Sequence, residues 1–240
     1  MKYLKFILLF NILLSFSANA LLEVNILKSK EAAFPIVIAP FEVISDSEEN
    51  IDIAKIIRDN LNRSGQFSAL STDALVTNQI NFNFWKEHKK DAVVFGKVEQ
   101  VSPRNYDVYV YIYDVFSEKS LYQKKIRVNN KGFRQIAHFL SDKIYYVLLG
   151  QKGSFNTRLS YVTVTENNSS GRTYRLQISD SDGFNPQTVV RQSNPILSPA
   201  WSKDQKKLAY VSFKNNRSEV FVMTPFLKTI PIKLPKFDGI

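Results

Sequence analysis

Leu159-Ser160-Tyr161-Val162-Thr163 recurs 49 residues further along the chain as Leu208-Ala209-Tyr210-Val211-Ser212. A second pair follows in the same order, because residues 174–178 (Tyr-Arg-Leu-Gln-Ile) align with residues 218–222 (Ser-Glu-Val-Phe-Val) 44 residues later. Repeats of roughly 40–50 residues that contain several short strands have the size of a β-propeller blade. The repeat therefore predicts propeller-type sheets in the part after Gly150, where no helical periodicity occurs. The alternative is chance similarity between two hairpins.

Residues 21–150 mix helical and strand periodicities, which predicts one α/β domain with a mixed sheet and two main helices. The first helix carries Ile53, Ile57 and Leu61 on one face, with Asn50 as its expected N-cap and Gly65 as its stop. The second helix extends from Gly132 to Leu149, and Gly150 ends it. The expected strands are residues 22–27, 35–41, 91–101, 106–115 and 121–128.

The strand at residues 106–115 has two different faces. Valine and isoleucine alternate with three tyrosines, so one face carries Val108, Val110 and Ile112 and the other carries Tyr109, Tyr111 and Tyr113. Aromatic strand faces usually pack under a helix, and this is the interpretation adopted; a ligand or partner surface is the alternative.

The composition argues against most kinds of catalytic site. The 240 residues include no Cys, two His and eight Gly, which excludes thiolate–zinc sites and Cys nucleophiles and leaves little material for phosphate-binding loops. His138, inside the second helix, is interpreted as a packing or surface residue because neither a second His nor a paired carboxylate accompanies it in the sequence. Asp180-Ser181-Asp182-Gly183 is interpreted as a turn, since Arg191 stands where a calcium loop needs Glu. We expect no enzyme activity, cofactor or metal.

The N-terminus has the features of a secretory signal. Lys2 and Lys5 precede an apolar stretch at residues 6–16, and Ala18-Asn19-Ala20 matches a cleavage site, so residues 1–20 are expected to be removed between Ala20 and Leu21. The alternative is an uncleaved anchor. The 32 Lys and Arg exceed the 22 Asp and Glu, but they are scattered along the chain. They indicate a solvated surface rather than a nucleic-acid site, and export places the chain outside the cytoplasm.

Several longer stretches resemble the TolB family of periplasmic Tol-Pal components. They are residues 153–162 (Gly-Ser-Phe-Asn-Thr-Arg-Leu-Ser-Tyr-Val), 182–190 (Asp-Gly-Phe-Asn-Pro-Gln-Thr-Val-Val), 196–202 (Ile-Leu-Ser-Pro-Ala-Trp-Ser) and 207–212. In the N-terminal part residues 35–41, 59–67 and 91–96 also fit the family. The Ser-Pro-Asp-Gly turn of the family is replaced by Ser202-Lys203-Asp204-Gln205, which lacks Pro and Gly.

The resemblance implies an N-terminal α/β domain followed by a six-bladed β-propeller and a non-enzymatic adaptor role in cell division and envelope integrity. It implies binding of the lipoprotein Pal by the propeller and of TolA by the start of the mature chain, which places the protein at the outer membrane through its partners, with no nucleic acid bound. The segment expected to contact TolA is Leu21, Leu22, Glu23, Val24, Asn25, Ile26 and Leu27. Its alternating Leu22, Val24 and Ile26 suit addition as a strand to a partner's sheet edge.

The length limits this expectation. The 83 residues from Arg158 to Ile240 have room for fewer than two blades, so the expected α+β fold is an α/β domain followed by the first one to two blades of a propeller, as in a C-terminally truncated copy. The expected domains are a signal peptide (1–20), an α/β domain (21–150), a linker (151–157) and a partial propeller (158–240). Two alternatives remain open: a non-functional fragment, and an exported hydrolase or sugar-binding protein using His88, Asp91 and Asp182.

Overall fold

A computed structural model describes residues 33–45, 52–72, 80–167, 171–227 and 229–235. Residues 33–240 group into one unit of structure, in which residues 33–150 are here called the α/β half and residues 158–235 the β half. The α/β half contains, in chain order, β1 (Phe34–Ile38), β2 (Glu42–Ile44), α2 (Ile53–Arg63), β3 (Phe67–Leu70), α3 (Phe82–Glu87), β4 (Ala92–Ser102), β5 (Asn105–Asp114), β6 (Ser120–Asn129), a 3-10 turn (Asn130–Gly132) and α4 (Phe133–Leu149).

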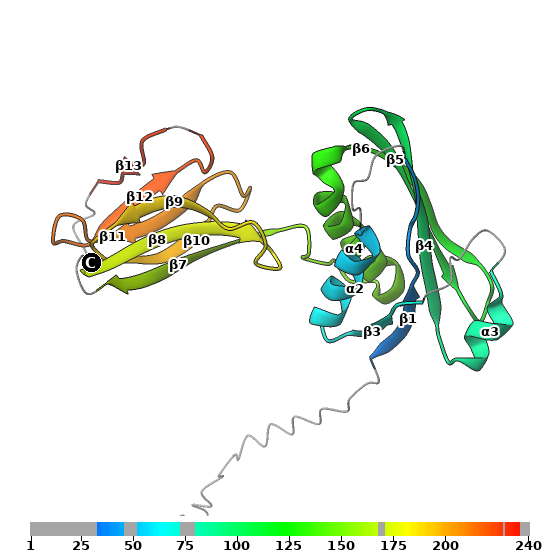
Figure 1. The fold of residues 1–240 in the computed structure, drawn as a ribbon. Coiled ribbons are helices and arrows are strands. Elements are labelled where there is room, and N and C mark those ends of the chain that lie inside the picture. The colour runs from blue at the N-terminus through cyan, green and yellow to red at the C-terminus, as the bar shows by residue number, and fades with distance from the viewer. Residues whose placement is uncertain (1–32, 46–51, 73–79, 168–170, 228, 236–240) are drawn as a thin grey trace, which may run out of the picture. The chain divides into compact units, whose positions relative to one another are not determined.

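The strands of the α/β half form a mixed sheet, as the sequence predicts. Within the described ranges its order is β3-β1-β4-β5-β6, and β2 pairs with β4 beyond the end of β1. β1 is parallel to β3 and β4, whereas β4, β5 and β6 form the expected antiparallel meander. The helices α2 and α4 cover one face of this sheet (Figure 1). The mixed sheet and its two main helices are thereby confirmed.

Capping residues define both main helices. The Asp52 side chain accepts a hydrogen bond from the Lys55 backbone N–H at 2.8 Å, so the N-cap of α2 is Asp52 and the expectation of Asn50 is wrong. Asn50 lies outside the described residues. Gly150 has φ +70° and ends α4, because the left-handed conformation of a C-terminal cap costs glycine no steric strain.

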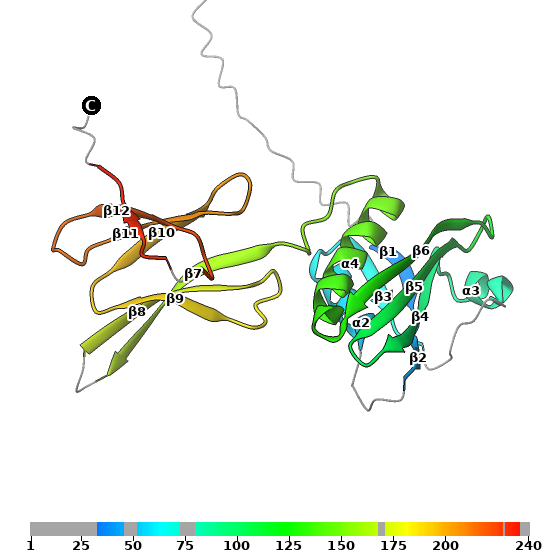
Figure 2. The ribbon, with the colours of Figure 1, turned by 90° about the horizontal axis from the view of Figure 1, so that it is seen from above.

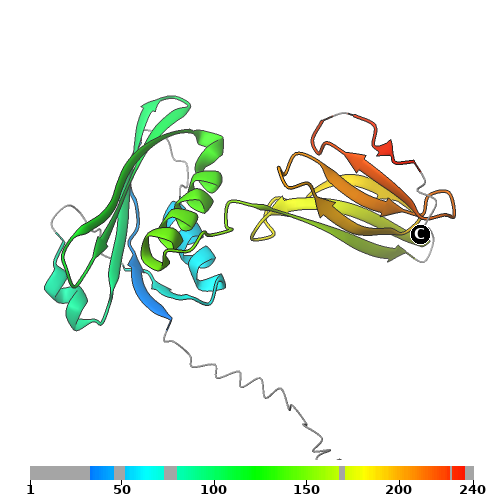
Figure 3. The same cartoon turned by 180° about the vertical axis from the view of Figure 1, so that it is seen from behind.

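The two faces of β5 pack in different ways. Val108, Val110 and Ile112 are fully buried against α2 and α4. On the opposite face Tyr111 stacks on Phe95 with ring centroids 5.0 Å apart, and the short helix α3 adds Trp85 to this smaller core. Figure 3 shows α3 on the side of the sheet away from α4. The tyrosine face is therefore packed only in part, by a short helix that the sequence analysis did not predict.

The β half consists of two open antiparallel sheets. β7 (Arg158–Asn167), β8 (Gly171–Asp180) and β9 (Gln187–Gln192) form one; β10 (Ile196–Trp201), β11 (Leu208–Ser212), β12 (Glu219–Met223) and β13 (Ile232–Lys233) form the other. Leu176 and Ile178 of the first sheet pack against Ile196, Leu208 and Tyr210 of the second. Over the residues described here the sheets do not close into a ring. The expectation of an incomplete propeller after an α/β domain is thus confirmed.

β10 was not predicted as a strand, and its backbone explains why. Pro199 cannot donate a ladder hydrogen bond, so its presence in a paired strand requires an irregularity. The register with β11 shifts between Leu197 and Ala200, and Ser198 adopts φ +50°. This bulge accommodates the proline, which a simple strand pattern does not allow.

The predicted signal peptide, its cleavage site at Ala20 and Leu21, and the segment from Leu22 to Leu27 all lie outside the described residues. Within the described part, no helix has both the length and the apolar content needed to cross a bilayer.

Candidate functional site

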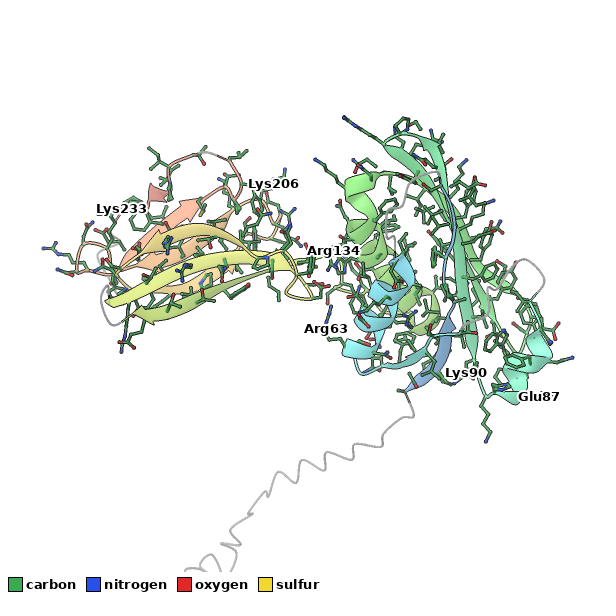
Figure 4. All side chains as sticks on the ribbon, in the orientation of Figure 1. Arg63, Glu87, Lys90, Arg134, Lys206 and Lys233 are labelled. Atoms are coloured by element: carbon green, nitrogen blue, oxygen red, sulfur yellow. The ribbon has the colours of Figure 1, made fainter. Side chains whose placement is uncertain are left out.

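Charged side chains connect α4 to the end of β8. The Arg134 guanidinium donates to Asp180 Oδ2 at 3.2 Å through Nε and to Asp182 Oδ2 at 2.5 Å through its terminal nitrogen. Figure 4 shows Arg134 where α4 meets the β half. Its planar fork holds two carboxylates at once, an arrangement that a lysine ammonium cannot reproduce with the same geometry.

His138 lies one turn further along α4 and is 3% exposed. The Asn60 side-chain amide nitrogen of α2 is 2.9 Å from His138 Nδ1 and donates to Ser141 Oγ at 2.9 Å. Since an amide nitrogen can only donate, His138 Nδ1 accepts from Asn60. On the other side of the ring, Nε2 lies 3.5 Å from a terminal nitrogen of Arg134 and 3.9 and 3.8 Å from Asp180 and Asp182. Burial lowers the pKa of His138, and this outweighs the opposing effect of the two carboxylates.

His138, Asp180 and Asp182 are residue types that bind metals, and their candidate ligand atoms lie within 4.8 Å of one another. The Arg134 guanidinium already bonds both carboxylates, so it takes the position in which a cation would neutralise them. The cluster is therefore a salt-bridged contact rather than a metal centre. Because backbone and arginine hydrogen bonds outweigh its partial burial, the pKa of Asp182 lies below its usual range.

His138, Asp180 and Asp182 were singled out from the sequence, but Arg134 and the proximity of the four side chains were not. The sequence analysis found no paired carboxylate near His138, and this premise is wrong, since Asp180 and Asp182 approach from a distant part of the chain. The sequence predicted a packing or a surface residue at His138, and the burial of the ring supports the first of these alternatives. The Asp-x-Asp-Gly turn was the only available signal, and it did not indicate which helix would meet it.

A cleft of about 560 Å³ lies beside the cluster. Its lining is mainly polar and basic and comes from both halves of the chain: Lys131, Arg134, Gln135, His138, Asn156, Thr157, Arg158, Asp180, Asn185, Trp201 and Gln205. The indole Nε1–H of Trp201 is buried there without a hydrogen-bond partner among the described residues. The arrangement offers hydrogen-bond donors and positive charge, which suits the binding of a polar or acidic group.

The segment 151–157, expected to be a linker, is held on the α/β half. Asp142 of α4 accepts hydrogen bonds from the backbone N–H groups of Phe155 at 2.7 Å and Asn156 at 3.2 Å. The Phe155 ring is 7% exposed and packs edge-on against Tyr145 at 5.7 Å. On its other side, Ser181 Oγ donates to the Phe155 carbonyl. The exact domain boundaries stay a prediction.

The residues nominated for a hydrolase do not come together. His88 caps the C-terminal end of α3, which lies on the side of the sheet away from α4 (Figure 3), and Asp91 directly precedes β4. Asp182 contacts α4 instead. The three side chains therefore do not form one site.

The fold and the cluster define a class of protein: an α/β domain joined by α4 to open propeller-type sheets. Two known families match its parts. Residues 22–121 match the TolB amino-terminal domain, and residues 145–234 match the TolB beta propeller domain. The chain belongs to the TolB family.

Relatives and a solved structure agree with this assignment. The chain is 55% identical to the Tol-Pal system protein TolB of Ruthia magnifica over 93% of its own length and 53% of that protein, and 35% identical to TolB of Coxiella burnetii over 92% and 52%. The crystal structure of TolB from Acinetobacter baumannii superposes with a TM-score of 0.75 at 34% identity, covering 86% of this chain and 50% of that one. The chain spans about half the length of the curated relatives it matches.

Proposed function

We propose that this chain is a non-enzymatic, periplasmic adaptor of the Tol-Pal system that supports outer-membrane invagination during division and envelope integrity. The observation that carries the proposal is the joint at Arg134, where one helix of an α/β domain is salt-bridged to a propeller-type sheet. Two binding modules held together in this way suit an adaptor. The printed names of the relatives, Tol-Pal system protein TolB, supply the system.

Export is part of the proposal. Residues 1–20 have the composition of a signal peptide, and cleavage between Ala20 and Leu21 would leave the segment from Leu21 at the mature N-terminus. N-terminal sequencing of the protein recovered from a periplasmic fraction tests this step. A mature chain that still begins at Met1 would contradict it.

The partner contacts divide between the two ends of the chain. The segment Leu21, Leu22, Glu23, Val24, Asn25, Ile26 and Leu27 is proposed to bind TolA as an added strand, because Leu22, Val24 and Ile26 alternate with polar residues. Pal is proposed to bind the propeller sheets.

Calorimetric titration of the mature chain with the periplasmic domains of TolA and Pal tests the proposal. Charge placed on one face of the segment, in Leu22→Asp, Val24→Asp and Ile26→Asp, should abolish TolA binding. The matched control, Glu23→Ala with Asn25→Ala, changes the other face and should leave TolA binding nearly unchanged. Failure of the folded chain to bind either partner would refute the proposal.

A further inference from the structure

β6 is a long edge strand. It extends over ten residues, Ser120–Asn129, and pairs with β5 along one side, while among the described strands none pairs with its other side. Figure 2 shows β6 beside α4, with which it also shares contacts. An unpaired strand edge presents a row of backbone N–H and C=O groups to any chain that can add as a further strand.

A groove separates this edge from α4. Its volume is about 590 Å³, and its apolar lining comes from Ile126 and Val128 of β6 and from Ile136 and Phe139 of α4. Ile126 and Val128 point to the helix side of the sheet, because Ile126 pairs with Val108, which is buried under the helices. A strand added to β6 would therefore place alternate side chains in the groove.

The rim of the groove is positively charged. Lys131, in the 3-10 turn before α4, lines the groove and is exposed. Lys124 is exposed on the helix side of β6, which it shares with Ile126, and the ammonium of Lys143 of α4 lies 5.8 Å from the ring of the lining residue Phe139. Among the described residues, none of the three lysines has a carboxylate within ion-pair distance. The nearby Asp142 is already engaged by the Phe155 and Asn156 backbone.

The opposite face of β6 differs in this respect. There Arg127 forms a two-pronged ion pair with Asp107, and Lys125 bonds the same carboxylate at 2.8 Å. The pKa of Asp107 is held well below its usual range by these hydrogen bonds. The cations of that face are neutralised within the protein, whereas those beside the groove are available for a ligand.

We propose that the groove between β6 and α4 binds an extended acidic segment of a partner protein. The segment adds as a strand along β6, places alternate apolar side chains against Ile126, Val128 and Phe139, and directs its carboxylates to Lys124 and Lys131. A polypeptide is favoured over other polyanions because the strand edge offers backbone hydrogen bonds and the groove offers apolar contacts. This surface is separate from the segment at Leu21–Leu27 and does not depend on the proposed Tol-Pal role.

A labelled decapeptide of alternating Glu and Val tests the proposal by fluorescence anisotropy with the full chain. Saturable binding is expected, with added hydrogen-exchange protection of β6 amides. Reversing both rim charges, in Lys124→Glu with Lys131→Glu, should weaken binding roughly tenfold or more, because two attractive contacts become repulsive. The matched control, Lys203→Glu with Lys206→Glu, applies the same charge change to exposed lysines of the β half and should leave binding nearly unchanged.

Two further probes distinguish the peptide from other ligands. A decapeptide of the same charge with proline at alternate positions cannot form the ladder hydrogen bonds and should not bind. Heparin should not compete with the Glu-Val peptide when salt is held constant. Absence of binding, equal binding of the proline peptide, effective competition by heparin, or unchanged affinity after reversal of Lys124 and Lys131 would each overturn the proposal.

Discussion

Arg134 is the residue on which the contact between α4 and the β half depends most. Replacement by Met keeps much of the apolar stem but leaves the carboxylates of Asp180 and Asp182, 32% and 19% exposed, without their cation. We expect Arg134→Met to lower the free energy of unfolding of the β half by about 1–2 kcal/mol. Urea unfolding followed by Trp201 fluorescence, in a Trp85→Phe background, measures this change.

The exposed Arg191, which forms no ion pair among the described residues, provides the control, and Arg191→Met should cost less than about 0.5 kcal/mol. Adding Asp180→Asn and Asp182→Asn to Arg134→Met should recover part of the loss, because no unpaired charges then remain. Equal effects of the two arginine replacements would contradict a special role for Arg134.

His138 makes the stability of the same contact dependent on pH. Burial lowers its pKa, with Arg134 and Arg63 acting in the same direction and Asp182 and Asp180 in the opposite one. As the pH falls below the ordinary histidine value of about 6.5, the unfolded chain takes up a proton that the folded chain does not. The free energy of unfolding should therefore fall as the pH is lowered from 7.5 to 5.5.

Urea titrations across this range test the prediction, and the slope should not exceed about 1.4 kcal/mol per pH unit for one group. His138→Gln should flatten it. His88→Gln, which removes the exposed histidine at the end of α3, should leave the slope unchanged. A slope that survives in His138→Gln would assign the pH dependence to other groups.

At the scale of elements, the turn between β10 and β11 shows how a sequence departure is tolerated. Ser202 Oγ bonds Asp204 Oδ1 at 2.6 Å and accepts from the Lys207 N–H at 2.9 Å, so the turn closes without proline or glycine. Gln205 occupies the position of the family's glycine at φ +58°. Gln205→Gly should therefore stabilise the β half by about 0.5–1 kcal/mol, through relief of left-handed strain.

Thermal unfolding followed by Trp201 measures this gain. Lys203→Gly in the same turn serves as the control, because Lys203 is outside the left-handed region and glycine there only adds chain entropy. It should be neutral or destabilising. An equal gain from both replacements would show that the turn responds to flexibility and not to the conformation of Gln205.

How far the elements could be predicted depended on whether their signal was local. Both main helices were predicted from local patterns. α2 has apolar residues at Ile53, Ile57 and Leu61, four positions apart, and α4 has an apolar stripe that ends at Gly150. β3 and α3 were not predicted because segments of four and six residues carry too little periodicity. β10 was not predicted because Pro199 argues against a strand unless the bulge at Ser198 is known. The Arg134 cluster depends on tertiary contact and has no local signal.

For the whole molecule, the segment 151–157 determines how the two halves are connected. The sequence predicts a linker there, yet Phe155 is buried on α4 and its carbonyl accepts from Ser181 of the β half.

Phe155→Ala should leave a cavity at this position, lower the stability of the α/β half by about 3 kcal/mol, and free the segment around the exposed Lys152. Trp85 fluorescence in a Trp201→Phe background and the rate of trypsin cleavage after Lys152 measure the two effects. Phe116→Ala, at a side chain 61% exposed in the same half, is the control and should change neither. If cleavage after Lys152 were as fast in the unmodified chain as in Phe155→Ala, the segment would be a free linker and the two halves would be coupled through Arg134 alone.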